Sequence, residues 1–304
     1  MSATAPHDVD VPVVRLHLRS TLEHVDWVAI ENYCIQPDGE GWAGVGWGLW
    51  GDERPGISWQ DYNRFKVEQG EPVVDSVRRL HDLPLGALVW SRRRDGTYWL
   101  GQITGEWLYA DRDETRRLDL FNLRPCRWWL VGTEDAVPGK IVNNFRARIA
   151  LNPVRDHTAV LYSRRLRDQF QGEAAAPEPI DPKAVVESLL GATDLEDLVA
   201  VYLQDRHGLI LVSRGRSTPG YEYVLRSRGD GRRAVASVKS GTTPVDLDRL
   251  PREDDVDVWA YAVSGKGAGV ARDDVRWINT KDLADFMIER SVVLPENVAR
   301  WLKA

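Results

Sequence analysis

The chain has 304 residues, of which 43% are hydrophobic and 28% are charged, and its formal net charge is −6. This composition is typical of a folded globular protein and excludes a disordered chain. The acidic balance argues against a protein that coats nucleic acid non-specifically.

The cysteines and histidines suggest neither a disulfide framework nor a zinc site. The two cysteines, Cys34 and Cys126, form no CxxC pair, and the six histidines form no HxxxH or HxH pair. The first residues lack the apolar core of a signal peptide, and no apolar run approaches the length of a membrane span. We therefore expect a cytoplasmic protein that does not enter a membrane.

The stretch QGEAAAPEPIDP, residues 171–182, is rich in alanine and proline and shows no hydrophobic periodicity. It predicts a semi-rigid linker. On either side we expect a domain of residues 1–170, which holds ten of the 13 tryptophans, and a domain of residues 183–304. A chain of this length is suited to two hydrophobic cores.

The N-terminal domain favours β-strands. Alternating or apolar-aromatic runs predict strands over 13–19, 27–35, 42–50 and 124–131. The segment 87–104 predicts a hairpin that turns at Asp95 and Gly96. Helices are predicted over 58–69, with Ser58 as the N-cap, and over 75–81. The pattern indicates a small β-barrel with helical insertions.

The C-terminal domain alternates between helices and strands. Helices are predicted over 181–191, 193–208, 280–290 and 294–303. Strands are predicted over 209–213, 221–227, 232–239, 256–263 and 275–279. This order favours an α/β sandwich, so the whole chain is predicted to combine two domains of mixed α and β structure.

The stretch AVASVKSG, residues 234–241, has the pattern of a strand end that carries chemistry. Alternation places Ser237 and Lys239 on one face and Val238 on the opposite, buried face. A tight turn joins this strand to YEYVLRS, so Glu222 and Lys239 are expected at one end of an antiparallel pair. A carboxylate there can hold Mg²⁺, and a lysine can stabilise the charge that develops in phosphodiester hydrolysis.

Two features near this strand have alternative interpretations. Residues 206–239 contain eight basic residues against two acidic ones, which suits contact with a phosphate backbone or, equally, a solvated arginine-rich hairpin. On the preceding helix, Glu196 lies at the rim of an apolar arc, while Asp197 is expected to point to solvent. Glu196 either reaches the sheet or forms a capping box with Thr193.

Three stretches in order, DLEDLVAVYLQ, TPGYEYVL and AVASVKSG, resemble the PD-(D/E)XK nuclease superfamily in its restriction-endonuclease-like, Mrr-type branch. The resemblance covers residues 182–304. It implies that Glu222 is the first acid, Glu196 the helix glutamate and Lys239 the catalytic lysine. Ser237 stands where the second carboxylate is expected, a position at which Mrr-like relatives often carry glutamine. The metal ligands implied are Glu222, Glu196 and the Val238 carbonyl.

The stretches LPLGALVWSRRRDGTYWLGQITGEWLYAD and LDLFNLRPCRWWLV, preceded by GVGWGLWGD, resemble PUA-like barrels of the EVE and ASCH type. The resemblance covers residues 13–129. It implies a domain that takes a flipped or modified base into an aromatic cage.

Candidate rings for such a cage are Trp47, Trp50, Trp59, Tyr62 and Trp99. Bases stack on aromatic rings for about 1–3 kcal/mol each, and glycines beside Trp47 and Trp50 allow close approach of a ligand. Core packing is the alternative for each ring, and we expect it for more than half of the ten N-terminal tryptophans.

The hairpin tip carries three consecutive arginines, Arg92, Arg93 and Arg94. We predict that they contact phosphate, with a solvated turn as the alternative.

The sequence thus predicts a modification-dependent, type IV-like DNA endonuclease of phage defence, with Mg²⁺ as cofactor and base-modified DNA as partner. A homodimer is expected because double-strand cleavage calls for two active sites. The alternatives are a catalytically inactive nucleic-acid-binding or regulatory protein on a nuclease fold, favoured by Ser237, and a sensor whose cage binds a nucleotide signal.

Overall fold

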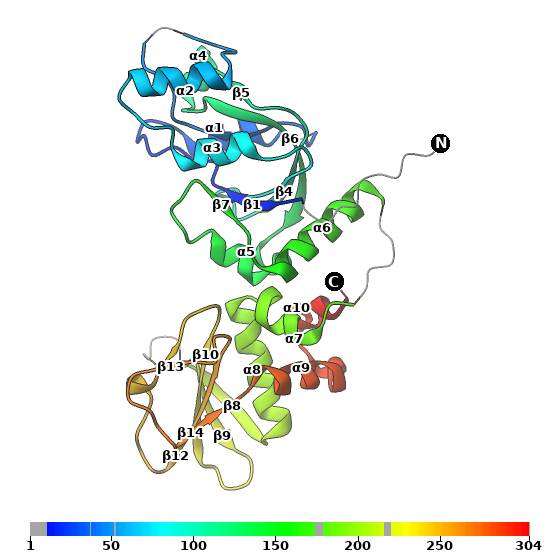
Figure 1. The fold of residues 1–304 in the computed structure, drawn as a ribbon. Helices are drawn as coiled ribbons and strands as arrows, with labels where there is room; N and C mark the ends of the chain where they lie inside the picture. Colours follow the sequence, from blue (N-terminus) through cyan, green and yellow to red (C-terminus); the bar gives the residue numbers. More distant parts are fainter. Residues whose placement is uncertain (1–10, 37, 52, 174–178, 216–219, 304) are drawn as a thin grey trace. The chain divides into compact units, whose positions relative to one another are not determined.

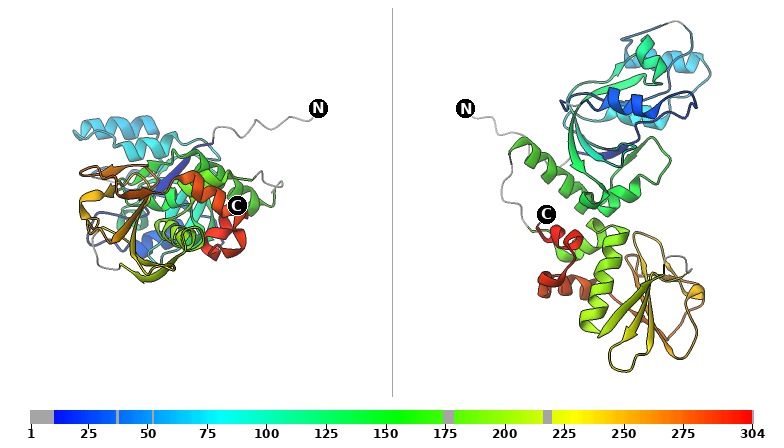
Figure 2. Two further views of the ribbon diagram at one scale, coloured as in Figure 1. Left: turned by 90° about the horizontal axis from the view of Figure 1, so that it is seen from below. Right: turned by 180° about the vertical axis from the view of Figure 1, so that it is seen from behind.

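The computed structural model describes residues 11–36, 38–51, 53–173, 179–215 and 220–303. The chain forms two compact units, shown in Figures 1 and 2. The first consists of the described residues of 1–137 and 144–174, and the second of those of 138–143 and 175–304. Residues 174–178 of the expected linker lie outside the described residues, as do Thr218 and Pro219 of the TPGYEYVL stretch.

The first unit is built on a seven-stranded sheet that curls into a half-barrel (Figure 1). The strand order is β2-β6-β4-β3-β1-β7, and β5 pairs with β6. The strands are β1 (Val13–Leu16), β2 (Trp42–Val45), β3 (Leu88–Arg92), β4 (Tyr98–Ile103), β5 (Leu108–Tyr109), β6 (Asn122–Gly132) and β7 (Leu151–Pro153). The β3–β4 hairpin predicted around Asp95 and Gly96 is confirmed.

The helices of this unit are α1 (Trp27–Cys34), α2 (Trp59–Glu68), α3 (Asp75–Asp82), α4 (Asp113–Arg117) and α6 (His157–Gln171), whereas α5 (Gly139–Asn144) belongs to the second unit except for its last residue. Two of them, α2 with its N-cap Ser58 and α3, confirm the sequence prediction. Helix α6 was not predicted, and it occupies the first residue of the expected linker.

One predicted strand is wrong: residues 27–34 form helix α1. Asp26 is the N-cap, and its carboxylate accepts a hydrogen bond of 2.9 Å from the amide of Val28. The helix buries Ile30 and Cys34, which lie one turn apart on the same face. The next predicted strand, 42–50, ends at Val45 because the following residues leave the sheet.

The second unit contains a five-stranded mixed sheet in the order β14-β12-β10-β9-β8. Its strands are β8 (Leu209–Arg214), β9 (Tyr223–Ser227), β10 (Arg233–Lys239), β12 (Val256–Ala262) and β14 (Val275–Trp277). Strands β10, β12 and β14 run parallel, whereas β9 is antiparallel to both β10 and β8. A small parallel pair, β11 (Val245–Asp246) with β13 (Gly267–Ala268), lies apart from this sheet.

The helical segments of the second unit are α7 (Pro182–Ala184), which continues into a π-helical turn (Val185–Leu189), α8 (Ala192–Arg206), α9 (Thr280–Glu289) and α10 (Glu296–Ala299). Helix α8 contacts β8 and β10, and it also contacts α9 (Figure 1). Both units therefore combine helices with a sheet, as the sequence predicts. Among the described residues, no helix combines the length and the apolar character that crossing a bilayer requires.

Candidate functional site

The end of the β9–β10 pair brings Glu222 and Lys239 together, as predicted. Regular pairing stops at Tyr223 and Ala236, and the Glu222 amide donates to the Ala236 carbonyl at 2.9 Å. Beyond this point the Glu222 side chain takes the place of the partner strand. One of its carboxylate oxygens accepts from the Val238 amide at 2.7 Å, and the other contacts the Lys239 ammonium group.

The peptide group of Val238 faces the side from which β9 has departed. Along a strand, the N–H and C=O of one residue point the same way, and those of residues i and i+2 share that direction. The Ala236 carbonyl points to β9, and so does the Val238 amide. The Val238 carbonyl, expected as a metal ligand, therefore points toward the same edge as the Glu222 carboxylate.

Ser237 is more deeply buried than the sequence suggests. The residue is 1% exposed, and its hydroxyl has no hydrogen-bond partner among the described residues. Its strand face continues into an apolar cluster around Val235 and Val258. The opposite face, with Val238, is buried as well. The sequence analysis expected the Val238 face of this strand to be the buried one, but at Ser237 both faces are buried.

Glu196 belongs to this group of residues and not to a helix cap. Helix α8 begins at Ala192, and its capping interaction is made by Asp194, whose carboxylate accepts from the Gly191 amide at 3.1 Å. The alternative of a capping box between Thr193 and Glu196 is thus excluded, because the helix starts too early for it. Burial raises the pKa of Glu196, and the negative charge of Glu222 raises it further.

Asp197 does not point freely to solvent, which corrects a second expectation. Its carboxylate forms a 2.6 Å ion pair with Arg214 on β8 and accepts from Asn297 at 3.3 Å. The side chain is half-buried, and it ties α8 to the edge of the sheet. Asp197 therefore has a structural partner on each side, whereas Glu196 lies within electrostatic range of Glu222 and Lys239.

Glu222 and Glu196 are the carboxylates near this strand end that could hold a magnesium ion. The described residues hold no cluster of three or more His, Cys, Asp or Glu side chains arranged for a metal. Mg²⁺, however, is commonly held by one or two carboxylates while water and substrate phosphate supply the remaining ligands. Glu222 and Glu196 provide two carboxylates, and an ionised carboxylate can accept more hydrogen bonds or ligands than the two that Glu222 uses.

In the first unit, the segment after β2 presents two exposed tryptophans. Trp47 is 40% exposed and Trp50 is 72% exposed. Trp47 has φ +63°, a left-handed conformation that is uncommon for residues other than glycine. Strain of this kind persists only where the surroundings impose it, and it is frequent in ligand-binding segments.

Buried side chains hold the backbone of this segment at three successive points. The Asn122 amide donates to the Gly46 carbonyl at 2.5 Å, and the Tyr62 hydroxyl donates to the Trp47 carbonyl at 2.7 Å. The Leu49 amide donates to the Tyr109 hydroxyl at 2.6 Å. The segment is therefore fixed by the core beneath it.

The other predicted rings do not extend this surface. Tyr62 is fully buried, so it supports Trp47 from below and offers no face to a base, which corrects the expectation. Trp59 stacks on His81 with ring centroids 4.0 Å apart. Trp99 is partly buried against the core and donates to Thr97 at 3.2 Å. Of the ten tryptophans that precede residue 171, Trp47 and Trp50 alone are exposed.

The three arginines of the β3–β4 hairpin have different environments. Arg93 is held by Glu31, at 3.6 Å, and by Asn32. Arg92 lies over the ring of Tyr98, and Arg94 lies over the ring of Trp27, which the sequence did not single out. Arg92 and Arg94 are exposed and free to contact phosphate, whereas Arg93 is a structural residue.

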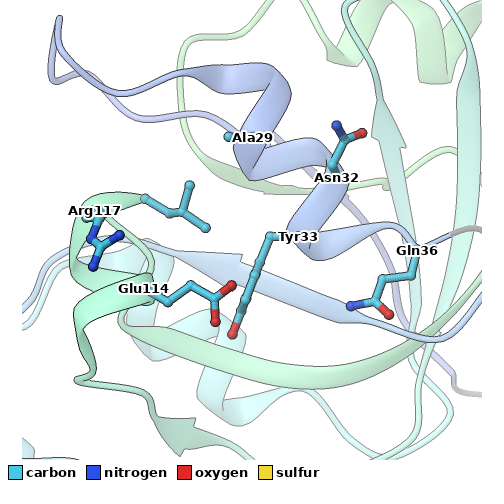
Figure 3. Close-up of a pocket in the computed structure, with 7 residues that line it drawn as sticks. Ala29, Asn32, Tyr33, Gln36, Glu114 and Arg117 are labelled. Carbon is cyan, nitrogen blue, oxygen red and sulfur yellow. The ribbon is translucent and has the colours of Figure 1, made fainter.

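A hollow of about 510 Å³ between α1 and α4 was also not predicted, because residues 27–35 were expected to form a strand (Figure 3). Its lining residues are Ala29, Asn32, Tyr33, Gln36, Glu114, Arg117 and Leu118. Figure 3 shows the Tyr33 hydroxyl lying toward the Glu114 carboxylate. Burial raises the pKa of Tyr33, and Glu114 raises it further.

Comparison of the chain with protein-family models, with curated proteins and with solved structures gives no match.

Proposed function

We propose that the chain is a modification-dependent DNA endonuclease of phage defence. Its second unit would hydrolyse phosphodiester bonds with Mg²⁺, and its first unit would recognise a modified base. One observation carries the proposal: the Glu222 carboxylate lies at a strand end, held by Lys239 and by the Val238 amide. The resemblance of this unit to PD-(D/E)XK nucleases and of the first unit to PUA-like barrels supports it.

The proposal gives each residue of the strand end a role. Glu222, Glu196 and the Val238 carbonyl would hold Mg²⁺, which supplies charge neutralisation at the phosphate when it is bound. Lys239 would bind a phosphate oxygen and orient the attacking water molecule, and its contact with Glu222 fixes its position.

The Ser237 hydroxyl would complete this arrangement through a water molecule. A buried polar group without a partner costs roughly 1–3 kcal/mol, and such groups in folded proteins are commonly satisfied by ordered water. Ser237 is buried without a partner among the described residues, on the face that also carries Lys239. A serine can thus position water where a carboxylate would have bound metal directly.

Base recognition would rest on Trp47 and Trp50. Both are exposed, and the backbone that carries them is fixed by buried donors and acceptors. Fixing a binding segment in advance lowers the entropy that a ligand must overcome. Stacking on an indole tolerates different bases, so the neighbouring polar groups would have to select the modification.

A second candidate is a catalytically inactive protein that binds nucleic acid or senses a nucleotide. The observation that favours it is the acid count at the strand end, where Ser237 replaces a carboxylate and two glutamates remain. In either case we propose a homodimer, in the cytoplasm, with DNA as the partner.

Digestion of phage DNA that contains hydroxymethylated cytosine, next to unmodified DNA, tests the proposal. Each substrate is incubated with the full chain in Mg²⁺ and in EDTA. Cutting of the modified DNA in Mg²⁺ alone would support the endonuclease. Binding without cutting would favour the inactive protein. Cutting that requires an added nucleotide would contradict inactivity and would favour an active nuclease that is released when the cage binds a nucleotide signal. Neither binding nor cutting of a panel of modified DNAs, with and without added nucleotides, would contradict the endonuclease and both of these alternatives.

A further inference from the structure

One end of the first unit's sheet gathers exposed arginines from three segments that are distant in sequence. Strands β1 and β3 run parallel, so Arg19, which follows β1, lies at the same end of the sheet as Arg92, the last residue of β3, and Arg94 beyond it. Strand β7 is antiparallel to β1, so the loop before β7, with Arg146 and Arg148, lies at the same end. We call these five residues the arginine edge.

Direct contacts join these segments. Arg19 donates to the backbone carbonyl of Arg148 at 3.3 Å. The guanidinium groups of Arg19 and Arg94 lie 5.9 and 5.4 Å from the ring centroid of Trp27. The ring of Trp27 thus connects the segment after β1 to the β3–β4 hairpin.

A buried arginine holds the loop that carries Arg146 and Arg148. Arg15 is fully buried and donates to the carbonyls of Ala147, Ile149 and Ala150. It forms no ion pair among the described residues, and its Nε has no partner there. Burying a cation without a carboxylate costs free energy. The hydrogen bonds from Arg15 to three backbone carbonyls offset part of this cost and fix the loop.

The arginines of the edge form no ion pair within the part of the chain that the structure describes, and all five side chains are exposed. Two acids of this region have other partners: Glu31 holds Arg93, and Asp95 accepts from Thr97 at 2.8 and 2.6 Å. Glu134 follows β6 at the same end of the sheet and acts on Tyr98, the ring that Arg92 covers, without an ion pair to the edge. By contrast, Arg64 and Arg78 on helices α2 and α3 each have a carboxylate partner.

Burial, and to a lesser degree the neighbouring positive charges, lowers the pKa of two groups beside the edge. Burial lowers the pKa of His17 to about 4, with further lowering by Arg15 and Arg19. The pKa of Arg15 is lowered to about 10 by burial and by the charge of Arg19. A chain with a net charge of −6 thus retains a local positive surface whose five arginines form no ion pair among the described residues.

We infer that the arginine edge binds the phosphodiester backbone of DNA and positions it for the first unit, an inference that rests on the proposed function. The five cations are all arginine, whose planar fork pairs with phosphate oxygens in a bidentate manner. Contacts of this kind set register and orientation without reading sequence. The arginine edge includes neither Trp47 and Trp50 nor Glu222 and Lys239. Substitutions in the edge therefore leave the residues proposed for base recognition and for cleavage unchanged.

Substitutions at Arg146 and Arg148 test the inference cleanly, because neither side chain forms a hydrogen bond or an ion pair within the described part of the chain. The variant R146Q/R148Q removes two charges from the edge. The control R117Q/R155Q removes two exposed, unpaired charges elsewhere in the unit. Arg155 follows β7 and so lies at its opposite end, which makes the pair a matched control.

Binding of a fluorescein-labelled 20-base-pair DNA duplex by the full chain is followed by anisotropy in EDTA over a series of salt concentrations. The slope of log K against log salt falls by about 0.9 for each phosphate that the protein no longer neutralises. We expect R146Q/R148Q to lower the slope by roughly 1–2 and the affinity about tenfold, while the control behaves as the wild type. Both variants should melt at the wild-type temperature.

An unchanged slope for R146Q/R148Q would overturn the inference, and if the wild type still cuts modified DNA the proposed function stands without it. A wild type that neither binds nor cuts duplex DNA would overturn the proposed function and the inference together. Binding to phosphatidylserine vesicles but not to DNA would assign the edge to a membrane surface and also contradict the inference. An RNA duplex in parallel shows which nucleic acid supplies the phosphates.

Discussion

The backbone amide of Val238 donates a 2.7 Å hydrogen bond to the carboxylate of Glu222, where a neighbouring strand would otherwise supply the acceptor. This bond fixes the carboxylate relative to β10, and therefore relative to Lys239 on the same strand. Electrostatic catalysis requires charged groups that are in position before the substrate binds. In the proposed nuclease, Glu222 and Lys239 would meet this requirement, because the Val238 amide fixes Glu222 and Glu222 contacts Lys239.

Lys239→Ala should abolish cleavage while leaving the fold and DNA binding nearly intact. The side chains of Lys239 and Glu222 are 25% and 21% exposed, so losing the pair should cost more than the about 0–1 kcal/mol of an exposed ion pair but leave the chain folded, with Glu222 still bound by the Val238 amide. A large loss of rate then has to come from the chemical step. Cleavage of modified DNA in Mg²⁺, anisotropy in EDTA and thermal melting are measured together. Cutting at the wild-type rate would remove Lys239 from the proposed site.

Glu196→Gln should stabilise the metal-free protein at neutral pH and impair cleavage. Burial and the charge of Glu222 raise the pKa of Glu196 above its ordinary value of 4.5, so the fold favours the neutral form. As pH rises through that raised pKa, the wild type loses stability that the glutamine variant keeps. In EDTA the two melting temperatures should agree near about pH 4 and separate toward about pH 8.

Added Mg²⁺ should narrow that separation, because a cation beside Glu196 favours its ionised form. Glu253→Gln is the control, since it makes the same change at a side chain that is 60% exposed. Equal pH profiles for Glu196→Gln and Glu253→Gln would mean that Glu196 does not share a site with Glu222.

Ser237→Asp should make stability depend on Mg²⁺. Ser237 is almost fully buried, so a carboxylate there is costly unless a cation accompanies it. Ser237→Asn has the same size without the charge, and therefore any overpacking affects both variants equally. We expect Ser237→Asp to melt below Ser237→Asn in EDTA, to recover in Mg²⁺, and to keep or raise cleavage activity. A folded Ser237→Asp variant that ignores Mg²⁺ would show that the serine does not adjoin a metal.

Local signals predicted much of the fold. Ser58 caps α2, and Asp95 and Gly96 turn the β3–β4 hairpin, because both positions depend on neighbours within a few residues. The meeting of Glu222 with Lys239 followed from strand alternation and a tight turn, which are local as well.

Some sequence predictions were wrong or missing because the local pattern was ambiguous or because the decisive partner lies far away in the sequence. The apolar run 27–35 is too short for its period to separate a helix from a strand, and Asp26 as an N-cap was the signal missed. The cap of α8 is formed by Gly191 and Asp194 and not by Thr193 and Glu196, because the helix begins two residues before the position that the sequence favours. No local pattern reveals that Arg15 holds a loop more than 130 residues away, since that depends on which strands pair.

The last prediction concerns Trp47, whose substitution can separate stacking from strain. Trp47→Ala removes the ring but keeps a side chain at φ +63°, whereas Trp47→Gly removes both the ring and the strain. Both variants should bind modified DNA more weakly by roughly 1–3 kcal/mol, the value of one stacked base. Trp47→Gly should unfold at a higher temperature than Trp47→Ala, because a left-handed residue other than glycine costs about 1–2 kcal/mol.

Trp99→Ala is the control for a tryptophan that packs against the core, and it should lower stability by up to about 3–5 kcal/mol without a selective loss of binding. Anisotropy on modified and unmodified duplexes measures binding, and thermal melting measures stability. Normal binding by Trp47→Ala together with early melting would assign Trp47 to the core. A wild-type chain that binds every modified duplex no better than unmodified DNA would contradict base recognition by the first unit. Trp47 and Trp50 would then be exposed for a reason other than stacking on a modified base.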